Sequence, residues 1–188
     1  MAKSKQKPLV FVGSSVEKLE LAQAIQSNLE PHYAQVNVWP ARVFKPGDVG
    51  IDSLLEQVKA CDFGVFICAA DDLVTRRGEK YKTVRDNVIF ELGLFMGRLG
   101  RKRAFIVIPR GVKLHLPSDL DGVNPVKFDP SRTDNVVAAM GSACHEIRAR
   151  IAELGRFRET PDELLSIAKS IEAPPPFPAI KGKPTRKR

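Results

Sequence analysis

The chain alternates short, almost wholly apolar runs with longer stretches in which apolar residues recur every three or four positions. Short apolar runs bounded by turn residues are typical of buried strands, and the longer period is typical of amphipathic helices. The predicted strands cover residues 9–12, 35–39, 63–69, 104–108 and 126–128. The predicted helices cover residues 16–29, 51–60, 87–99 and 136–154.

This alternation predicts an α/β fold with one parallel sheet, because parallel strands need crossover connections and helices supply them. Five such strands favour the flavodoxin-like order 2-1-3-4-5, with helices on both faces of the sheet. Ligands of such sheets bind at the carboxyl ends of the strands. The main connecting segments, at residues 40–50, 73–85 and 109–122, are expected to be loops.

The net charge of +8 does not belong to the predicted domain. The first seven residues carry three lysines, the last sixteen carry five basic residues, and neither end carries an acid. Residues 8–172 therefore have equal numbers of basic and acidic side chains. Nucleic acid is expected to bind weakly at most, through the two ends of the chain.

The same composition predicts how the chain is divided. The expected parts are a basic, disordered N-terminus (1–7), a single domain (8–154), and a short helix followed by a proline-rich basic tail (155–188). No apolar run approaches the roughly 20 residues that span a bilayer, and the N-terminus lacks the apolar core of a signal peptide. Three cysteines form no even disulfide framework, so we expect a reducing, cytoplasmic location.

The predicted helix at residues 87–99 carries the most informative polar residues. Apolar side chains cover most of its circumference, which predicts burial on nearly all sides. Asn87, Glu91 and Arg98 fall within about 40° of one another on this helix. A lone carboxylate there is costly unless it is paired or faces a cleft. Glu91 therefore has three interpretations: an ion pair with Arg98 or Arg85, a contact between subunits, or a catalytic carboxylate.

Several motifs carry a resemblance to a known family. They are residues 11–15 (Phe-Val-Gly-Ser-Ser), 38–39 (Val-Trp) with 44–47 (Phe-Lys-Pro-Gly), 62–63 (Asp-Phe) leading to 71–72 (Asp-Asp), 85–93 (Arg-Asp-Asn-Val-Ile-Phe-Glu-Leu-Gly) and 116–122 (Leu-Pro-Ser-Asp-Leu-Asp-Gly). Through them, residues 9–150 resemble a bacterial Toll/interleukin-1 receptor (TIR) domain. The subtype is the one found in cyclic-nucleotide-activated antiphage effectors.

This resemblance implies a flavodoxin-like fold and an NAD⁺ glycohydrolase that cleaves the bond between nicotinamide and ribose. It implies that Glu91 is the catalytic glutamate. It also implies that NAD⁺ is consumed as a substrate, so no cofactor or metal ion is expected. Members of the family often act as oligomers, driven by a sensor domain that binds a cyclic nucleotide. The residues after Gly155 are too few for a sensor, so we expect a homo-oligomer triggered by a separate sensor protein or cyclic nucleotide, by self-assembly, or through a longer chain.

The expected chemistry assigns roles to residues at the carboxyl ends of the strands. Loss of nicotinamide passes through an oxocarbenium-like transition state, which a carboxylate such as Glu91 stabilises. Asn87, one helical turn earlier, can hydrogen-bond Glu91 or the ribose. Gly13, Ser14 and Ser15 can hold a phosphate at a helix N-terminus, although the two serines can equally be helix caps.

Other residues complete the expected substrate site. Trp39 and Phe44 can stack on nicotinamide or adenine, although Trp39 can equally be a core residue. The arginines Arg76, Arg77 and Arg85 can neutralise the diphosphate. The remaining candidates for substrate contact are Asp71 and Asp72. These acids follow the third strand, as in response-regulator receivers, but a receiver also needs acids after the first strand to bind Mg²⁺.

Two other functions remain open. The first is a TIR module that only self-associates or recruits a partner. The second is another glutamate-dependent enzyme acting on N-ribosyl bonds, such as a nucleoside deoxyribosyltransferase or a nucleotide N-glycosidase. Glu91 favours an enzyme over a scaffold, because a scaffold has no need of an acid on an apolar helix.

Overall fold

The structure, a computed structural model, describes residues 6–40, 50–69, 72–76, 79–112, 116–120 and 122–157. Within these ranges it does not describe the side chains of residues 40, 72–76, 79–82 and 118. The predicted basic N-terminus, apart from its last two residues, lies outside this description. The predicted helix and tail beyond residue 157 lie outside it as well.

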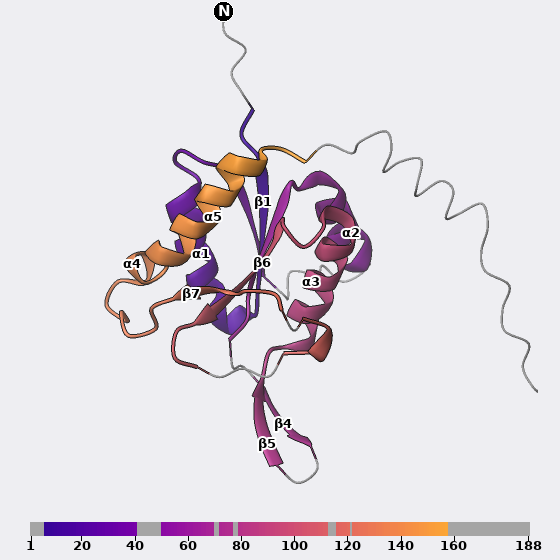
Figure 1. The fold of residues 1–188 in the computed structure, drawn as a ribbon, viewed down its shortest axis with the longest axis vertical. Helices are drawn as coiled ribbons and strands as arrows, with labels where there is room; N and C mark the ends of the chain where they lie inside the picture. Colours follow the sequence, from indigo (N-terminus) through magenta and orange to yellow (C-terminus); the bar gives the residue numbers. More distant parts are fainter. Residues whose placement is uncertain are drawn as a thin grey trace, which may run out of the picture. The chain divides into compact units, whose positions relative to one another are not determined.

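A five-stranded parallel sheet forms the centre of the domain (Figure 1). Its strands are β1 (Leu9–Ser14), β2 (Gln35–Pro40), β3 (Phe63–Ile67), β6 (Ala104–Pro109) and β7 (Val126–Phe128). They pair in the order β2-β1-β3-β6-β7, which confirms the predicted order 2-1-3-4-5. Because every pair is parallel, all five carboxyl ends lie along one edge of the sheet.

Helices cover both faces of this sheet, as the sequence predicts (Figure 1). One face carries α1 (Leu19–Leu29), α4 (Val136–Ala139) and α5 (Gly141–Leu154). The other face carries α2 (Gly50–Ala60) and α3 (Asp86–Leu99). Successive side chains of a strand point to opposite faces, so each central strand contributes to two separate cores. Among the described residues, no helix is long and apolar enough to cross a membrane.

The core under α3 is aromatic. The Phe11 ring lies 4.6 Å from that of Phe95 and 5.8 Å from that of Phe66, between ring centroids. All three side chains are fully buried. Gly64 pairs with Phe11 across the sheet, and a Cβ atom at this glycine would lie 2.8 Å from Phe95 and 2.7 Å from Phe66. The missing side chain therefore lets the Phe95 ring of α3 approach the sheet.

The segment predicted as a loop at residues 73–85 instead contains a β-hairpin. Strands β4 (Asp72–Arg76) and β5 (Glu79–Thr83) pair antiparallel and form a separate two-stranded sheet. The prediction was wrong because charged residues dominate the composition of this segment. Its strands nevertheless contain the residue types that favour strands, with Val74 and Thr75 adjacent in β4, and Tyr81 and Thr83 alternating with lysines in β5.

The helix predicted for residues 136–154 is interrupted at Met140, where α4 ends and α5 begins. Asn135 caps α4, because its Oδ1 accepts a hydrogen bond from the Ala138 amide at 2.9 Å. Gly141, the first residue of α5, weakens a continuous helix at this point. The predicted helix from Val16 also begins as a 3-10 turn (Val16–Lys18) before α1.

We expect Gly64→Ala to lower the free energy of unfolding by about 1–3 kcal/mol, because the added methyl group overpacks the ring contacts. Gly97→Ala is the matched control. Position 97 lies in α3 with nothing within 4 Å of a new Cβ atom, so there the substitution should stabilise the protein by about 0.5–1 kcal/mol. Urea unfolding midpoints measure both effects, and equal shifts for the two variants would contradict this account of the core.

Candidate functional site

The candidate site lies at the carboxyl end of β1, on the face of the sheet that α2 and α3 cover. Gly13 is the last residue of β1 to point toward this face. It pairs with Trp39 of β2 on one side and with Phe66 of β3 on the other. Two aromatic residues therefore flank a position that has no side chain of its own.

Glu91 of α3 fills the space above Gly13. A Cβ atom at position 13 would lie 2.7 Å from Glu91 Oε2, which is closer than real Cβ contacts. The apolar residues Val88, Leu92 and Phe95 anchor α3 on the sheet, and Glu91 is on the same buried side of the helix with only 5% of its surface exposed. The prediction that this helix is buried on nearly all sides is wrong: Phe90 is 54% exposed, and Asn87 and Gly93 are exposed as well. One side of α3 therefore faces solvent, while Glu91 lies on the buried side.

Within the described residues, the Oε2 atom of Glu91 lacks the partners that normally stabilise a buried charge. This atom is inaccessible to solvent and has no hydrogen-bond partner within the described structure. Burial raises the pKa of Glu91 to about 7, because the charged form is poorly solvated there. A raised pKa in a sheltered position is typical of functional carboxylates, and it leaves both protonation states populated near neutral pH.

The two arginines proposed as partners of Glu91 contact other groups. Arg85 Nη2 forms an ion pair with Glu17 Oε1 at 3.3 Å. The guanidinium of Arg98 lies over the ring of Phe157, 4.7 Å from its centroid. Among the described residues, burial is the cause of the raised pKa of Glu91, and none of their cations lowers it. The interpretation of Glu91 as half of a structural ion pair is therefore the weakest of the three.

The serines after Gly13 lie differently from the expected phosphate-binding turn. Ser14 and Ser15 are both fully buried. Ser14 follows Val12 by two residues, so it points to the other face of the sheet, and its Oγ has no hydrogen-bond partner within the described residues. Ser15 stands at the N-cap of the 3-10 turn, but its side chain makes no capping hydrogen bond. The interpretation of the Ser15 hydroxyl as a helix cap is wrong.

The remaining candidates divide into three groups. Trp39 is half-buried beside Gly13, and its ring centroid lies 6.0 Å from that of Phe11. Asn87 is exposed at the start of α3. The candidates outside the described residues are Phe44, Asp71 and Arg77, together with the side chains of Asp72 and Arg76. Phe66 escaped prediction, because only the pairing register of β1 with β3 brings it against Gly13.

Comparison with known proteins identifies the family. Residues 9–130 match the family model described as CAP12/Pycsar effector protein, TIR domain. This chain belongs to that family. The TIR domain is 44% identical to the Pycsar effector protein PaPycTIR of Pseudomonas aeruginosa, over 78% of this chain and 48% of that protein. It is 40% identical to BcPycTIR of Burkholderia cepacia, over 80% of this chain and 50% of that protein.

A third relative carries the other name of the family. CD-NTase-associated protein 12 of Flavobacterium daejeonense is 42% identical over 65% of this chain and 39% of its own length. The resemblance found in the motifs is therefore confirmed for the family. The chain spans about half the length of the curated relatives it matches or less, so the similarity concerns their TIR domains.

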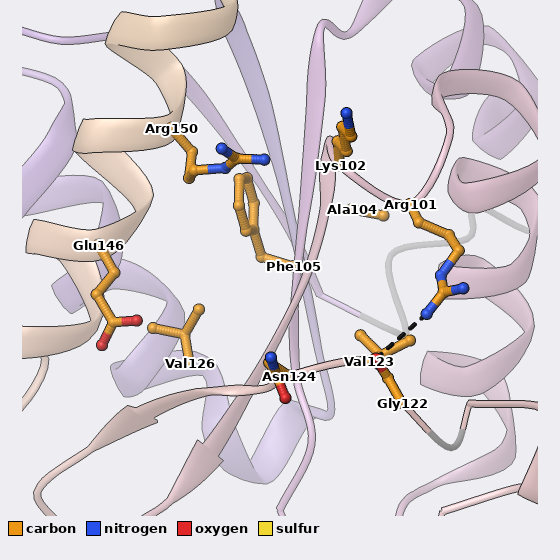
Figure 2. Close-up of a pocket in the computed structure, with 10 residues that line it drawn as sticks. All are labelled: Arg101, Lys102, Ala104, Phe105, Gly122, Val123, Asn124, Val126, Glu146 and Arg150. Carbon is orange, nitrogen blue, oxygen red and sulfur yellow. Dashed lines mark hydrogen bonds between the residues drawn. The ribbon is translucent and has the colours of Figure 1, made fainter.

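Two cavities of the described part of the TIR domain are not lined by Glu91. One, of about 540 Å³, lies at the amino ends of β6 and β7, at the edge of the sheet opposite Gly13 (Figure 2). Basic side chains Arg101, Lys102 and Arg150 surround it. The other, of about 420 Å³, lies at the carboxyl ends of β6 and β7, against α1 and α4. Among the described residues, no cluster of His, Cys, Asp or Glu can hold a metal ion.

We expect Gly13→Ala to destabilise the TIR domain by about 1–3 kcal/mol, because its methyl group would displace Glu91 and Phe66. In a Glu91→Ala background the same substitution should cost less, since the contact with the carboxylate is gone. A double-mutant cycle of urea unfolding energies measures this coupling. Additive energies would mean that Glu91 does not lie over Gly13.

The raised pKa of Glu91 predicts a specific dependence of stability on pH. The pKa of Glu91 is about 7 in the folded protein and about 4.5 in the unfolded chain. The folded protein therefore binds a proton at Glu91 more tightly than the unfolded chain does. Stability should therefore fall by about 3 kcal/mol as the pH rises from about 4.5 to about 7. Glu91→Gln should remove this slope and be more stable than the natural sequence at pH 8. Unfolding in urea between pH 4.5 and pH 8 tests both statements.

Proposed function

We propose that this TIR domain is an NAD⁺ glycohydrolase that cleaves the bond between nicotinamide and ribose, with Glu91 as its catalytic carboxylate. The observation that carries the proposal is the buried Oε2 atom of Glu91, which has no hydrogen-bond partner within the described residues. An acid in this place is costly for the fold, and its position above Gly13 at the carboxyl edge is where sheets of this type bind ligands.

The proposed chemistry needs little besides this carboxylate. Nicotinamide leaves NAD⁺ as a neutral molecule, so the leaving group needs no proton. Positive charge then accumulates on the ribose in an oxocarbenium-like transition state. Ionised Glu91 stabilises that charge and binds the ribose hydroxyl groups. A water molecule then adds to the anomeric carbon of the ribose and releases a proton, which leaves ADP-ribose. Because the surroundings are apolar, the interaction is stronger than in water.

The cationic substrate also favours the ionised form of Glu91. Burial leaves the carboxyl group with a pKa of about 7 in the absence of ligand. The positively charged pyridinium ring of NAD⁺ favours the ionised form when it lies nearby, and lowers that pKa. Ionising Glu91 is therefore costly when the site is empty. When NAD⁺ is bound, the ionised form predominates.

Further residues have proposed roles around this centre. Trp39 stacks on the nicotinamide or adenine ring, and Asn87 hydrogen-bonds the ribose. The backbone of Gly13, Ser14 and Ser15 and the side chain of Arg85 bind the diphosphate. Phe44, Asp71 and Asp72 complete the set of proposed substrate contacts. The hydroxyl groups of the two serines are buried, so backbone amides suit the phosphate better than these side chains do.

We further propose that the domain acts in antiphage defence and that assembly activates it. Two of its relatives are named as effector proteins, and the chain covers only about half of their length. A cyclic-nucleotide trigger would then act through a separate sensor protein or through parts of a longer chain. At low concentration the isolated domain should be nearly inactive, since no partner copy completes or orders its site.

The decisive experiment follows nicotinamide release from NAD⁺ by concentrated protein. Glu91→Ala and Glu91→Gln should each lower turnover by about 100-fold or more. Glu146→Gln, an exposed acid on α5, is the charge-matched control and should keep full activity. Turnover that survives both Glu91 substitutions would sink the catalytic assignment, and strong turnover at nanomolar concentration without a ligand would contradict activation by assembly.

Substrate choice separates the remaining functions. Release of free bases from nucleosides or nucleoside monophosphates, with none from NAD⁺, would favour the other N-ribosyl enzymes. No release in any assembly state, with cyclic nucleotides also added, would favour a scaffold. The buried acid favours an enzyme over a scaffold, because a scaffold gains nothing from its cost.

The pH dependence of kcat/KM should report the titration of Glu91 in the free enzyme. The ionised form is the active one, so kcat/KM should rise with pH and level off above about pH 7. An ordinary exposed glutamate would instead give a profile that is flat from pH 5.5 upward. Initial rates of nicotinamide release between pH 5 and pH 8.5 distinguish the two.

A further inference from the structure

The end of the described domain is held by hydrogen bonds, an ion pair and ring contacts. Helix α5 ends at Leu154, where Gly155 adopts a φ of 60°. Arg103, just before β6, donates from Nη2 to the Leu154 carbonyl at 3.0 Å and from Nη1 to the Gly155 carbonyl at 2.8 Å. A guanidinium bound to the last carbonyls of a helix satisfies them and complements the helix dipole.

A buried acid holds the next two residues. Asp62, just before β3, is only 3% exposed. Its Oδ1 accepts a hydrogen bond from the Phe157 amide and its Oδ2 accepts one from the Leu9 amide, both at 2.8 Å. Arg156 Nε lies 3.5 Å from the same Oδ2. One carboxylate therefore ties residue 157 to the start of β1 and to the start of β3.

The side chain of Phe157 then contacts α3. The guanidinium of Arg98 lies 4.7 Å from the Phe157 ring centroid, and that of Arg103 lies 5.4 Å from it. The ring also packs against the apolar core beneath α3. Arg98 is in the last turn of α3, so residue 157 fixes the end of the helix that carries Glu91.

The position of Glu91 depends on contacts elsewhere on α3, because no described residue holds its Oε2 atom by a hydrogen bond. The position of α3 therefore decides where the atom lies. Glu91 Oε2 already lies in the space that a Cβ atom at Gly13 would need, so the carboxylate is close to the sheet. Arg98 follows Glu91 by seven residues, which is roughly 10 Å along the helix axis and on the same side of it. A helix is stiff over that length, so a shift at Arg98 also moves Glu91.

We propose that Phe157 is a positioning residue for Glu91: its ring contact with Arg98 sets how deeply α3 holds the carboxylate against Gly13. The kinetic part of this inference rests on the proposed function, whereas the geometric part does not. A merely structural role for Phe157 would stabilise the domain without affecting the environment of Glu91. The two roles therefore differ in what a substitution changes.

The test compares Phe157→Ala, Phe157→Tyr and Arg156→Ala in the full chain, at a temperature well below every Tm. Phe157→Ala removes the ring, whereas Phe157→Tyr keeps it between the two arginines and serves as the rescue variant. Arg156→Ala is the matched control, since this neighbour contacts Asp62 but not the ring. The readouts are the pKa of Glu91 by carbon NMR of its carboxyl group, and kcat and KM for NAD⁺.

We expect Phe157→Ala to lower the pKa of Glu91 from about 7 toward the ordinary glutamate value, because a looser α3 admits water. Its kcat should fall about tenfold with little change in KM, as expected when a catalytic group is misplaced. Phe157→Tyr and Arg156→Ala should match the natural sequence in both readouts.

A lower Tm for Phe157→Ala with unchanged pKa and kcat would overturn the inference and leave Phe157 a structural residue. Equal effects of Phe157→Ala and Arg156→Ala would overturn it too, since the ring would then not be responsible. If even the natural sequence cleaves no NAD⁺, the proposed function fails, but the pKa of Glu91 still decides whether Phe157 controls its position.

Discussion

The candidate site depends on one close approach, that of a helix carboxylate to a glycine in the central strand. Glu91 occupies the space that a side chain at Gly13 would take. Removing an acid from water without a partner costs free energy, and the rest of the fold must supply it. The raised pKa of Glu91 is the electrostatic consequence of this arrangement. A surface carboxylate at the same edge would destabilise the fold less, but it would interact far more weakly with a developing cation.

The aromatic core beneath α3 supplies much of that support. Phe11 and Phe66 from the sheet pack against Phe95 from the helix, four residues after Glu91. Gly64 leaves the space that these rings occupy. Packing of this kind is dense and resists displacement, so α3 has one preferred depth on the sheet. The same contacts that stabilise the fold therefore also determine how deeply the carboxylate is buried.

The two ends of the sheet carry different features of the domain. The carboxyl end presents Glu91, whereas the amino end holds the start of β1 and the last described residues around Asp62 and Arg103. Helix α3 connects the two ends, because Glu91 and Arg98 lie two turns apart on it.

The sequence by itself determined the strand order and the two-faced architecture, since both follow from local periodicity, and it singled out Glu91 as a carboxylate on a largely apolar helix. Only the tertiary structure revealed that Gly13 faces Glu91 while Ser14 faces away. It also revealed that Phe66 lies against Gly13 and that Phe157 contacts Arg98 at the end of α3. The hairpin of β4 and β5 also escaped prediction. The physical reason is common to all of them: strand register and contacts between distant residues decide which side chains meet, and local sequence pattern does not encode either.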